Sequence, residues 1–254
     1  MIINNKKIIG ITVGDPAGIG IEIAVKVSLL DKVLHTAIPI LIGNSFLIQD
    51  YIDKYFSNKK ILINNIRSCR DVIYYVPTKK KVINVYNASG LKQNIIQLGK
   101  ASKESGKESI KYLEASLDLI NKKIISAVVT CPISKKAIEL AGYNFPGHTE
   151  FFAEKTNTKK YLMAFYSKDL KVALVSRHIA LKDVSSYITK EKITEVIDLI
   201  NININNPKIA VCGLNPHAGE QGVIGKEEED IIIPAINEAK NKGVDIHGPF
   251  PAAT

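Results

Sequence analysis

Apolar positions along the chain fall into two kinds of segment, and the first kind is short and apolar at consecutive positions. Runs of this kind, rich in isoleucine and valine, predict strands that are buried on both faces of a parallel sheet. Seven such runs are found: Ile8–Val13, Ile38–Ile42, Val82–Tyr86, Ile124–Thr130, Leu162–Tyr166, Val172–Val175 and Ile209–Leu214.

The second kind of segment has apolar residues at helical spacing and lies between the strand-like runs. The segment Lys226–Lys242 also opens with four acids and ends in lysines before Gly243, an order that suits a helix dipole, although Pro234 starts or kinks a helix. Alternating strands and helices predict an α/β fold with a mainly parallel sheet. The clearest helical stripes are Ile110, Leu113, Leu117 and Ile120, and Ile193, Val196, Ile197 and Ile200.

Composition narrows the class of protein. The 254 residues are 46% apolar and 23% charged, which excludes a disordered chain, a collagen and a disulfide miniprotein. No apolar run is long enough to span a bilayer, and the first residues lack the apolar core of a secretory signal. Cys69, Cys131 and Cys212 are scattered without a CxxC spacing, which indicates reduced thiols. We therefore expect a cytoplasmic protein with no membrane partner.

The chain is basic, with 34 − 25 = +9 charges at neutral pH. Basic proteins bind nucleic acids, membrane surfaces or phosphorylated small molecules. Lysines are spread along this chain, and no zinc-finger, helix-turn-helix or RNA-binding motif accompanies them. We expect no nucleic-acid partner, whereas a small phosphorylated substrate agrees with the charge.

A glycine-rich segment, Thr12–Glu22, follows the first predicted strand and opens a helix. Its candidate cofactor-binding residues are Gly14, Asp15, Gly18 and Gly20. Helix N–H groups behind such a loop favour an anion, but the spacing is not the GxGxxG of dinucleotide-binding loops. A tight turn between strand and helix is an equally good interpretation.

Three histidines are candidate site residues: two directly follow a predicted strand, and the third lies in a segment further along the chain after another predicted strand. His148 and Thr149 come after the segment Thr130–Lys136 and offer a titratable ring and a hydroxyl; alternatively, Thr149 caps a helix. His178 and His217 each follow a strand and would suit Zn²⁺ if they converged at one sheet edge. Two ligands do not complete a metal site, and a polar loop residue is the alternative for each.

Four motifs together resemble the 4-hydroxythreonine-4-phosphate dehydrogenase family of pyridoxal phosphate biosynthesis. They are GDPAGIG at 14–20, GHTEFF at 147–152, CGLNPHAGE at 212–220 and GPFPA at 248–252. The resemblance covers residues 4–254. It implies a fold like those of the isocitrate and isopropylmalate dehydrogenases, with two α/β lobes at about 1–125 and 126–254 around a cleft. It also implies a homodimer with shared active sites, NAD or NADP, and Zn²⁺, Mg²⁺ or Co²⁺.

The resemblance also implies roles for particular residues. His148 and Thr149 match the substrate-binding pair, and His178 and His217 match two of three metal-binding histidines. The implied reaction oxidises 4-phosphooxy-L-threonine and decarboxylates the product, with the metal's help, to 3-amino-2-oxopropyl phosphate. The alternatives are a paralogue acting on another phosphorylated hydroxy acid, such as a threonate or erythronate, or an inactive remnant.

The sequence departs from the family pattern at its end. The family continues beyond residue 254 through a segment that carries the third metal histidine, so we expect a C-terminally truncated chain that lacks the completing segment. The family also has an aspartate where this chain has Ala253, and a proline where it has Ile21.

Overall fold

The computed structural model describes residues 2–3, 6–66, 68, 81–91 and 95–252. The chain forms two compact units, Met1–Phe152 (the first unit) and Ala153–Thr254 (the second unit). The sequence places the boundary between lobes near residue 125, whereas the structure groups the chain as far as Phe152 with the first unit. Cys69 and Ala253 lie outside the described residues.

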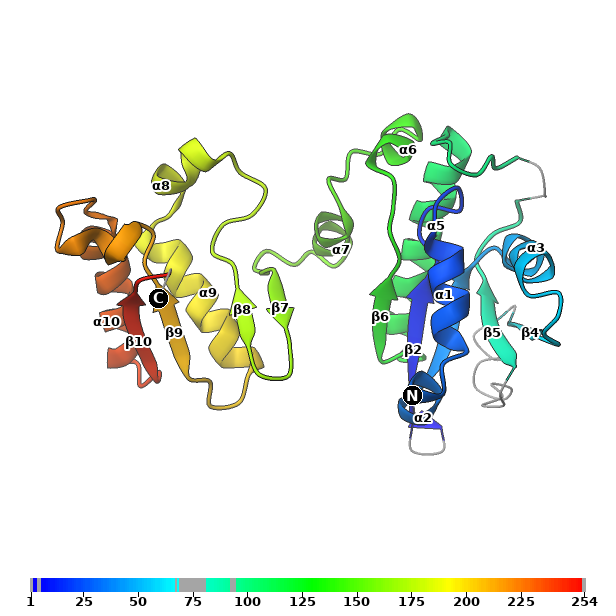
Figure 1. Cartoon of the computed structure of the whole chain (residues 1–254), viewed down its shortest axis with the longest axis horizontal. Helices are drawn as coiled ribbons and strands as arrows, with labels where there is room; N and C mark the ends of the chain where they lie inside the picture. The colour runs from blue at the N-terminus through cyan, green and yellow to red at the C-terminus, as the bar shows by residue number, and fades with distance from the viewer. Residues whose placement is uncertain (1, 4–5, 67, 69–80, 92–94, 253–254) are drawn as a thin grey trace. The chain divides into compact units, whose positions relative to one another are not determined.

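The first unit is built on a parallel sheet with the strand order β6-β2-β3-β5-β4, and the short β1 pairs antiparallel with β2 (Figure 1). Its strand-to-helix loops therefore leave the sheet at one edge, where ligands bind in such folds. The strands are β1 (Ile2–Ile3), β2 (Lys6–Thr12), β3 (Ala37–Gly43), β4 (Leu62–Ile66), β5 (Val82–Asn87) and β6 (Ala127–Thr130).

Helices cover both faces of this sheet. In Figure 1, α1 lies in front of the sheet and α5 behind it. Ile8, Ile40, Leu41 and Val85 are completely buried in the core between these layers. The helices are α1 (Gly20–Ser28), α2 (Asp31–Thr36), α3 (Ser45–Tyr55), α5 (Lys103–Asn121), α6 (Lys135–Leu140) and α7 (His148–Lys155).

The second unit contains two small sheets. Strands β9 (Ile209–Cys212) and β10 (Ile246–Phe250) pair in parallel, and β7 (Ala164–Tyr166) and β8 (Lys171–Ala173) pair antiparallel. Residues of α9 and α10, such as Ile193, Ile197 and Ile236, form its core with Ile246 of β10. The helices are η1 (Leu181–Asp183), α8 (Val184–Tyr187), α9 (Lys190–Asn203), η2 (Pro216–Glu220), η3 (Glu228–Ile232) and α10 (Ile233–Asn241).

The predicted α/β class with a mainly parallel sheet is confirmed, and each of the seven predicted strands overlaps an observed one. Two expectations are wrong. Strands β7 and β8 are antiparallel and exposed, with Phe165 59% and Tyr166 63% accessible, so they are not parallel strands buried on both faces. The predicted helix over 226–242 begins instead as the π-helix η3, and α10 follows with Pro234 in its first turn.

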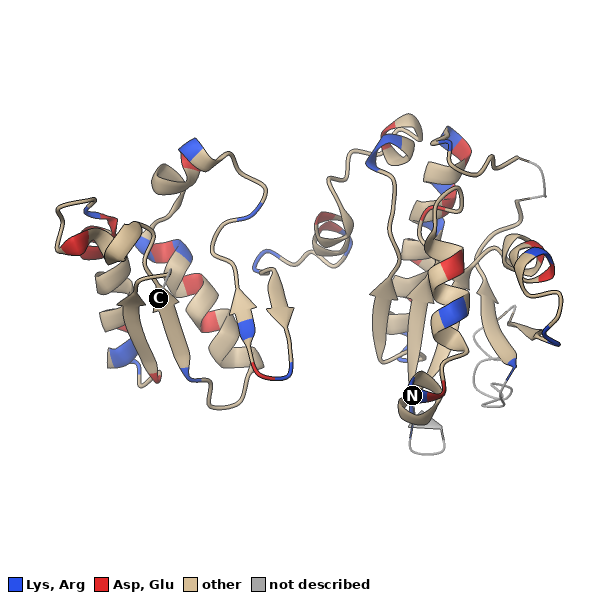
Figure 2. Cartoon of the chain, viewed as in Figure 1, with Lys and Arg blue, Asp and Glu red and all other residues tan. Residues whose placement is uncertain are grey.

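Lysine and arginine are scattered over helices and loops of both units rather than gathered on one element (Figure 2). The net positive charge is thus not concentrated on any one described element. Within the described part of the chain, no helix combines the length and the apolar character needed to cross a membrane.

Candidate functional site

The loop between β2 and α1 packs tightly against the segment that follows β6. Gly14 has a φ of +70°, and a Cβ at this position would lie 2.2 Å from the carbonyl oxygen of Pro132. A Cβ at Gly20 would lie 1.9 Å from the carbonyl oxygen of Val13. Only glycine fits such backbone contacts without a shift. Close packing therefore accounts for both glycines, as the tight-turn interpretation expects.

Asp15 forms hydrogen bonds with backbone groups of this loop and of the segment after β6. Its buried carboxylate accepts a hydrogen bond from the Ala17 N–H at 2.8 Å, and its own N–H donates to the Pro132 carbonyl at 3.0 Å. The Gly18 N–H donates to the Asp15 carbonyl at 2.9 Å. A carboxylate of the chain itself thus occupies part of the turn in front of α1. Cofactor binding by Gly14, Asp15, Gly18 and Gly20 stays a prediction.

His148 reaches the same edge of the sheet from the start of α7. Its Nε2 is shielded from solvent and has no hydrogen-bond partner among the described residues. Burial lowers the pKa of His148, and a hydrogen bond with the backbone of Cys131 opposes that shift. The Cys131 carbonyl also abuts Gly14. The structure therefore brings the Gly14–Asp15 turn, Cys131 and a neutral imidazole with an unused nitrogen to one place.

Thr149 lies beside His148 in the first turn of α7 and is half-buried. The interpretation of Thr149 as a helix cap is wrong, because the helix already begins at His148 and the Phe151 N–H donates to the Gly147 carbonyl at 3.2 Å. The cap position belongs to Gly147.

The lowered pKa of His148 gives a testable pH dependence. The unfolded chain binds a proton at this ring more readily than the folded chain does, so the stability due to neutral His148 is present above about pH 6.5 and is lost as the pH falls. We expect an NMR titration to place the pKa of His148 below 6.5, the ordinary value for histidine. His148→Gln should flatten the pH dependence of the unfolding free energy between about pH 7 and 5. A pKa at or above 6.5 would contradict the burial argument.

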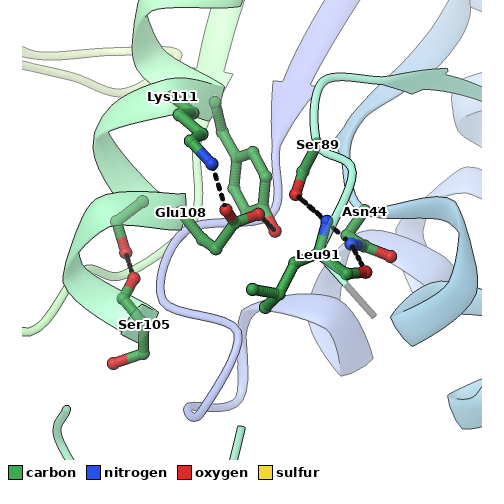
Figure 3. Close-up of polar contacts among 8 residues, drawn as sticks. Asn44, Ser89, Leu91, Ser105, Glu108 and Lys111 are labelled. Atoms are coloured by element: carbon green, nitrogen blue, oxygen red, sulfur yellow. Dashed lines mark hydrogen bonds and ion pairs between the residues drawn. The ribbon is translucent and has the colours of Figure 1, made fainter. Parts of the chain in front are cut away.

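Behind this edge lies a buried polar cluster around Glu108, which the sequence analysis missed (Figure 3). The Glu108 side chain is 1% exposed and accepts hydrogen bonds from Lys111 Nζ at 2.8 Å and from the Tyr112 hydroxyl at 3.1 Å. Burial, and then the charge of Glu108, raise the pKa of Tyr112, which keeps the phenol neutral as a donor. The sequence feature that could have indicated this cluster is a glutamate four residues before a tyrosine on the apolar side of a predicted helix.

Asn44 orders the neighbouring loops of the same edge. Its side-chain oxygen caps α3 by accepting hydrogen bonds from the Phe46 and Leu47 N–H groups. Its Nδ2 donates to the Leu91 carbonyl at 2.9 Å and to Ser89 Oγ at 3.4 Å (Figure 3). The turns after β3 and β5 are therefore held together by one buried amide.

Tyr112→Phe tests the buried cluster. Loss of the hydroxyl removes one hydrogen-bond donor from a buried carboxylate, so we expect the free energy of unfolding to fall by about 1–2 kcal/mol. Urea denaturation measures this change. Tyr55→Phe, at a half-exposed position in the same unit, is the control and should change stability by less than about 0.5 kcal/mol. An equal effect of the two changes would show that the hydrogen bond to Glu108 contributes nothing.

His178 and His217 both lie in the second unit: His178 is on the loop after β8, and His217 is in η2, an irregular turn after β9 whose backbone is non-helical at His217. Each is exposed and has a left-handed backbone, with φ values of 54° and 52°. The two histidines do not follow strands of one sheet, because β8 and β9 belong to separate two-stranded sheets. No group of three or more His, Cys, Asp or Glu side chains gathers as a metal site in the described residues. Metal binding by these two histidines stays a prediction.

Comparisons with known proteins agree with the resemblance drawn from the motifs. A profile of the pyridoxal phosphate biosynthetic protein PdxA matches residues 35–254. A 4-hydroxythreonine-4-phosphate dehydrogenase of Sulfurihydrogenibium sp. is 39% identical over 97% of this chain and 74% of its own length. A putative D-threonate 4-phosphate dehydrogenase of Oceanobacillus iheyensis is 38% identical over 99% of this chain and 76% of its own.

The fold gives the same result. A crystal structure of 4-hydroxythreonine-4-phosphate dehydrogenase from Klebsiella pneumoniae superposes with a TM-score of 0.87 at 30% identity. The match covers 97% of this chain and 74% of that one. The fold implied by the motifs is confirmed, and the chain belongs to the family of the pyridoxal phosphate biosynthetic protein PdxA.

Proposed function

We propose that this chain is an NAD(P)-dependent dehydrogenase that oxidises 4-phosphooxy-L-threonine, also called 4-hydroxythreonine 4-phosphate, in pyridoxal phosphate biosynthesis. Decarboxylation of the oxidised product then gives 3-amino-2-oxopropyl phosphate. Family membership supports the class of reaction, and the name of the relative from Sulfurihydrogenibium supports the substrate. The structural observation that carries the proposal is the environment of His148.

His148 has the properties of a substrate-contacting residue. Its Nε2 is buried without a partner among the described residues, and a buried polar atom of this kind loses free energy unless a ligand or water satisfies it. Burial keeps the ring neutral, so it can accept or donate a hydrogen bond to a substrate hydroxyl. Thr149, one residue further along the same turn, adds a hydroxyl. We assign both residues to substrate binding.

His178 and His217 are the residues that would hold the divalent metal. Both rings are exposed, and neither makes a hydrogen bond within the described part of the chain, so their nitrogens are available as donors. Imidazole suits Zn²⁺ and Co²⁺ better than Mg²⁺. When bound, such a metal would lower the pKa of the substrate alcohol, and it would polarise the new ketone carbonyl so that this group takes up charge as the carboxylate leaves as CO₂. The Gly14–Gly20 turn is the candidate for contact with the nicotinamide cofactor.

A second candidate substrate is D-threonate 4-phosphate. The relative from Oceanobacillus, at nearly the same identity as the first, is named a putative dehydrogenase of this compound. The two substrates share the phosphate and the secondary alcohol and differ at C2, where one carries an ammonium group and the other a hydroxyl. Discrimination between them therefore depends on the contacts to C2.

The test is reduction of NAD and NADP by the purified chain, followed by absorbance, with each of the two substrates and with Zn²⁺, Mg²⁺ or Co²⁺ added. We expect a higher kcat/KM for 4-hydroxythreonine 4-phosphate. A higher value for D-threonate 4-phosphate would replace the first candidate by the second. Absence of turnover with both substrates and all three metals would leave the inactive remnant as the better description of this chain.

We further infer a cytoplasmic homodimer whose active sites are shared between subunits. The dimer rests on the family resemblance, and light scattering of the purified chain measures it directly. The cytoplasmic location rests on cysteine usage, since Cys131 and Cys212 are both free thiols.

A further inference from the structure

Glu228 lies buried beside the loop that carries His217. Its side chain is 2% exposed, although it belongs to a run of four acids. One carboxylate oxygen accepts hydrogen bonds from the Leu214 and Asn215 N–H groups, at 2.7 and 2.8 Å, and the other accepts from Asn215 Nδ2 at 2.9 Å. Three hydrogen-bond donors, all from the first residues of the loop, thus bind a single carboxylate.

The loop is folded closely around this carboxylate. A Cβ at Gly219 would lie 2.6 Å from one oxygen of Glu228, and a Cβ at Gly213 would lie 3.2 Å from the other. The carboxylate therefore contacts the backbone on both sides of His217. It binds the loop through main-chain groups and leaves the imidazole itself exposed.

The same loop has a backbone conformation that is costly without such support. His217, Ala218, Glu220 and Gln221 have φ values of 52°, 51°, 46° and 56°, and none of them is glycine. A left-handed backbone is unfavourable for any residue other than glycine, and a run of such residues persists only where the surrounding structure fixes it. Glu228 binds the residues just before this run and lies close to Gly219 within it.

A second carboxylate extends the support to α8. Asn215 Nδ2 also donates to Glu227 at 2.8 Å, and Ser185 Oγ of α8 donates to the other oxygen of Glu227 at 2.5 Å. Glu228 itself begins the π-helix η3, an element that is common at functional sites. Figure 2 shows the acidic residues of this turn in red.

We propose that Glu228 is a positioning residue: it holds the loop 213–221 in the left-handed conformation that presents His217 to a metal ion. The metal role of His217 comes from the proposed function, on which this inference rests. The support of the loop by Glu228 can be measured without any metal.

The first test is backbone hydrogen exchange of the metal-free protein. In Glu228→Gln we expect the amides of Leu214 and Asn215 to exchange about tenfold faster or more, because a charged acceptor is replaced by a neutral one. Glu228→Ala should have a larger effect. Asp230→Asn removes the same charge from an exposed position of the same helix, and it should leave these amides unchanged.

Two outcomes of this test overturn the proposal. One is equal exchange at Leu214 and Asn215 in Glu228→Gln and Asp230→Asn. The other is faster exchange spread evenly through α9 and α10 as well, since Glu228 would then stabilise the whole unit rather than this loop.

The second test is Co²⁺ affinity, measured by competition with a chromophoric chelator. We expect Glu228→Gln to weaken binding about 10- to 100-fold, the size typical for residues that orient a metal ligand. If His217→Ala weakens binding and Glu228→Gln does not, the positioning role fails and the proposed function stands. If His217→Ala binds Co²⁺ like the unchanged chain, the metal role in the proposed function fails, and the exchange measurement still decides whether Glu228 holds the loop.

Discussion

Replacement of His217 by alanine is expected to abolish metal-dependent turnover and to leave the stability of the fold nearly unchanged. The ring is exposed and makes no hydrogen bond within the described residues, so its loss removes no packing. Residues that merely orient a metal ligand change affinity about 10- to 100-fold, and loss of a ligand itself should exceed that range. The metal content of the purified variant and its urea denaturation curve measure the two halves of this prediction.

His247→Ala is the matched control, because His247 is also an exposed histidine of the second unit and its ring contacts the exposed Asp245. It should retain metal and turnover. Normal metal content in His217→Ala would contradict the assignment. A large loss of stability in this variant would contradict the view that the ring projects freely from its loop.

The sequence predicts the first unit better than the second because its central strands β2 and β3 are largely buried and therefore rich in apolar residues. Strand β4, with the sequence LINNI, is not predicted from the sequence because two asparagines interrupt its apolar pattern. Asn64 lies opposite Asn84 of β5, and its Nδ2 donates to the Asn84 oxygen at 2.9 Å. A hydrogen bond between two side-chain amides joins these neighbouring strands, where other strand pairs have apolar contacts. The sequence of one strand does not show which residue it will face on the next.

The second unit departs from prediction for a different reason. The predicted runs Leu162–Tyr166 and Val172–Val175 are as apolar as the buried strands, but only five residues separate the two runs. A connection this short joins antiparallel strands, and β7 and β8 pair in this way. Apolar content alone does not distinguish an exposed hairpin from a buried parallel strand. The short connection between the two runs is the feature that distinguishes them.

In the candidate sites, the sequence identifies the residues that we propose contact a ligand and misses the buried carboxylates near them. His148 and His217 stand in distinctive motifs. Glu108 and Glu228 lie on helices, where a charged residue is normally solvated, and the run around Glu228 was interpreted as charge suited to a helix dipole. Glu228 accepts its hydrogen bonds from Leu214 and Asn215, in a loop earlier in the chain, and this pairing exists only in the fold. Glu108 accepts hydrogen bonds from Lys111 and Tyr112 one turn further along its own helix, but the spacing alone does not show that this side of the helix is buried.

Gly20→Ala tests whether the glycine-rich turn is needed for packing or for the cofactor. Helix propensity alone predicts that alanine at the first residue of α1 stabilises the protein by up to about 1 kcal/mol. The new Cβ would instead lie 1.9 Å from the Val13 carbonyl oxygen, a main-chain atom next to the buried core. We therefore expect the unfolding free energy to fall by about 3 kcal/mol, at the upper end of the usual cost of overpacking.

Gly90→Ala is the matched control, because Gly90 is exposed and has no atom within 4 Å of the added Cβ. Its stability should stay the same or rise by up to about 1 kcal/mol, since alanine restricts the unfolded chain. If Gly20→Ala is as stable as this control and loses only affinity for NAD or NADP, the packing explanation is wrong and the turn is a cofactor site. If it loses stability, as the contact with Val13 requires, Gly20 has a structural reason to be glycine that is independent of any ligand.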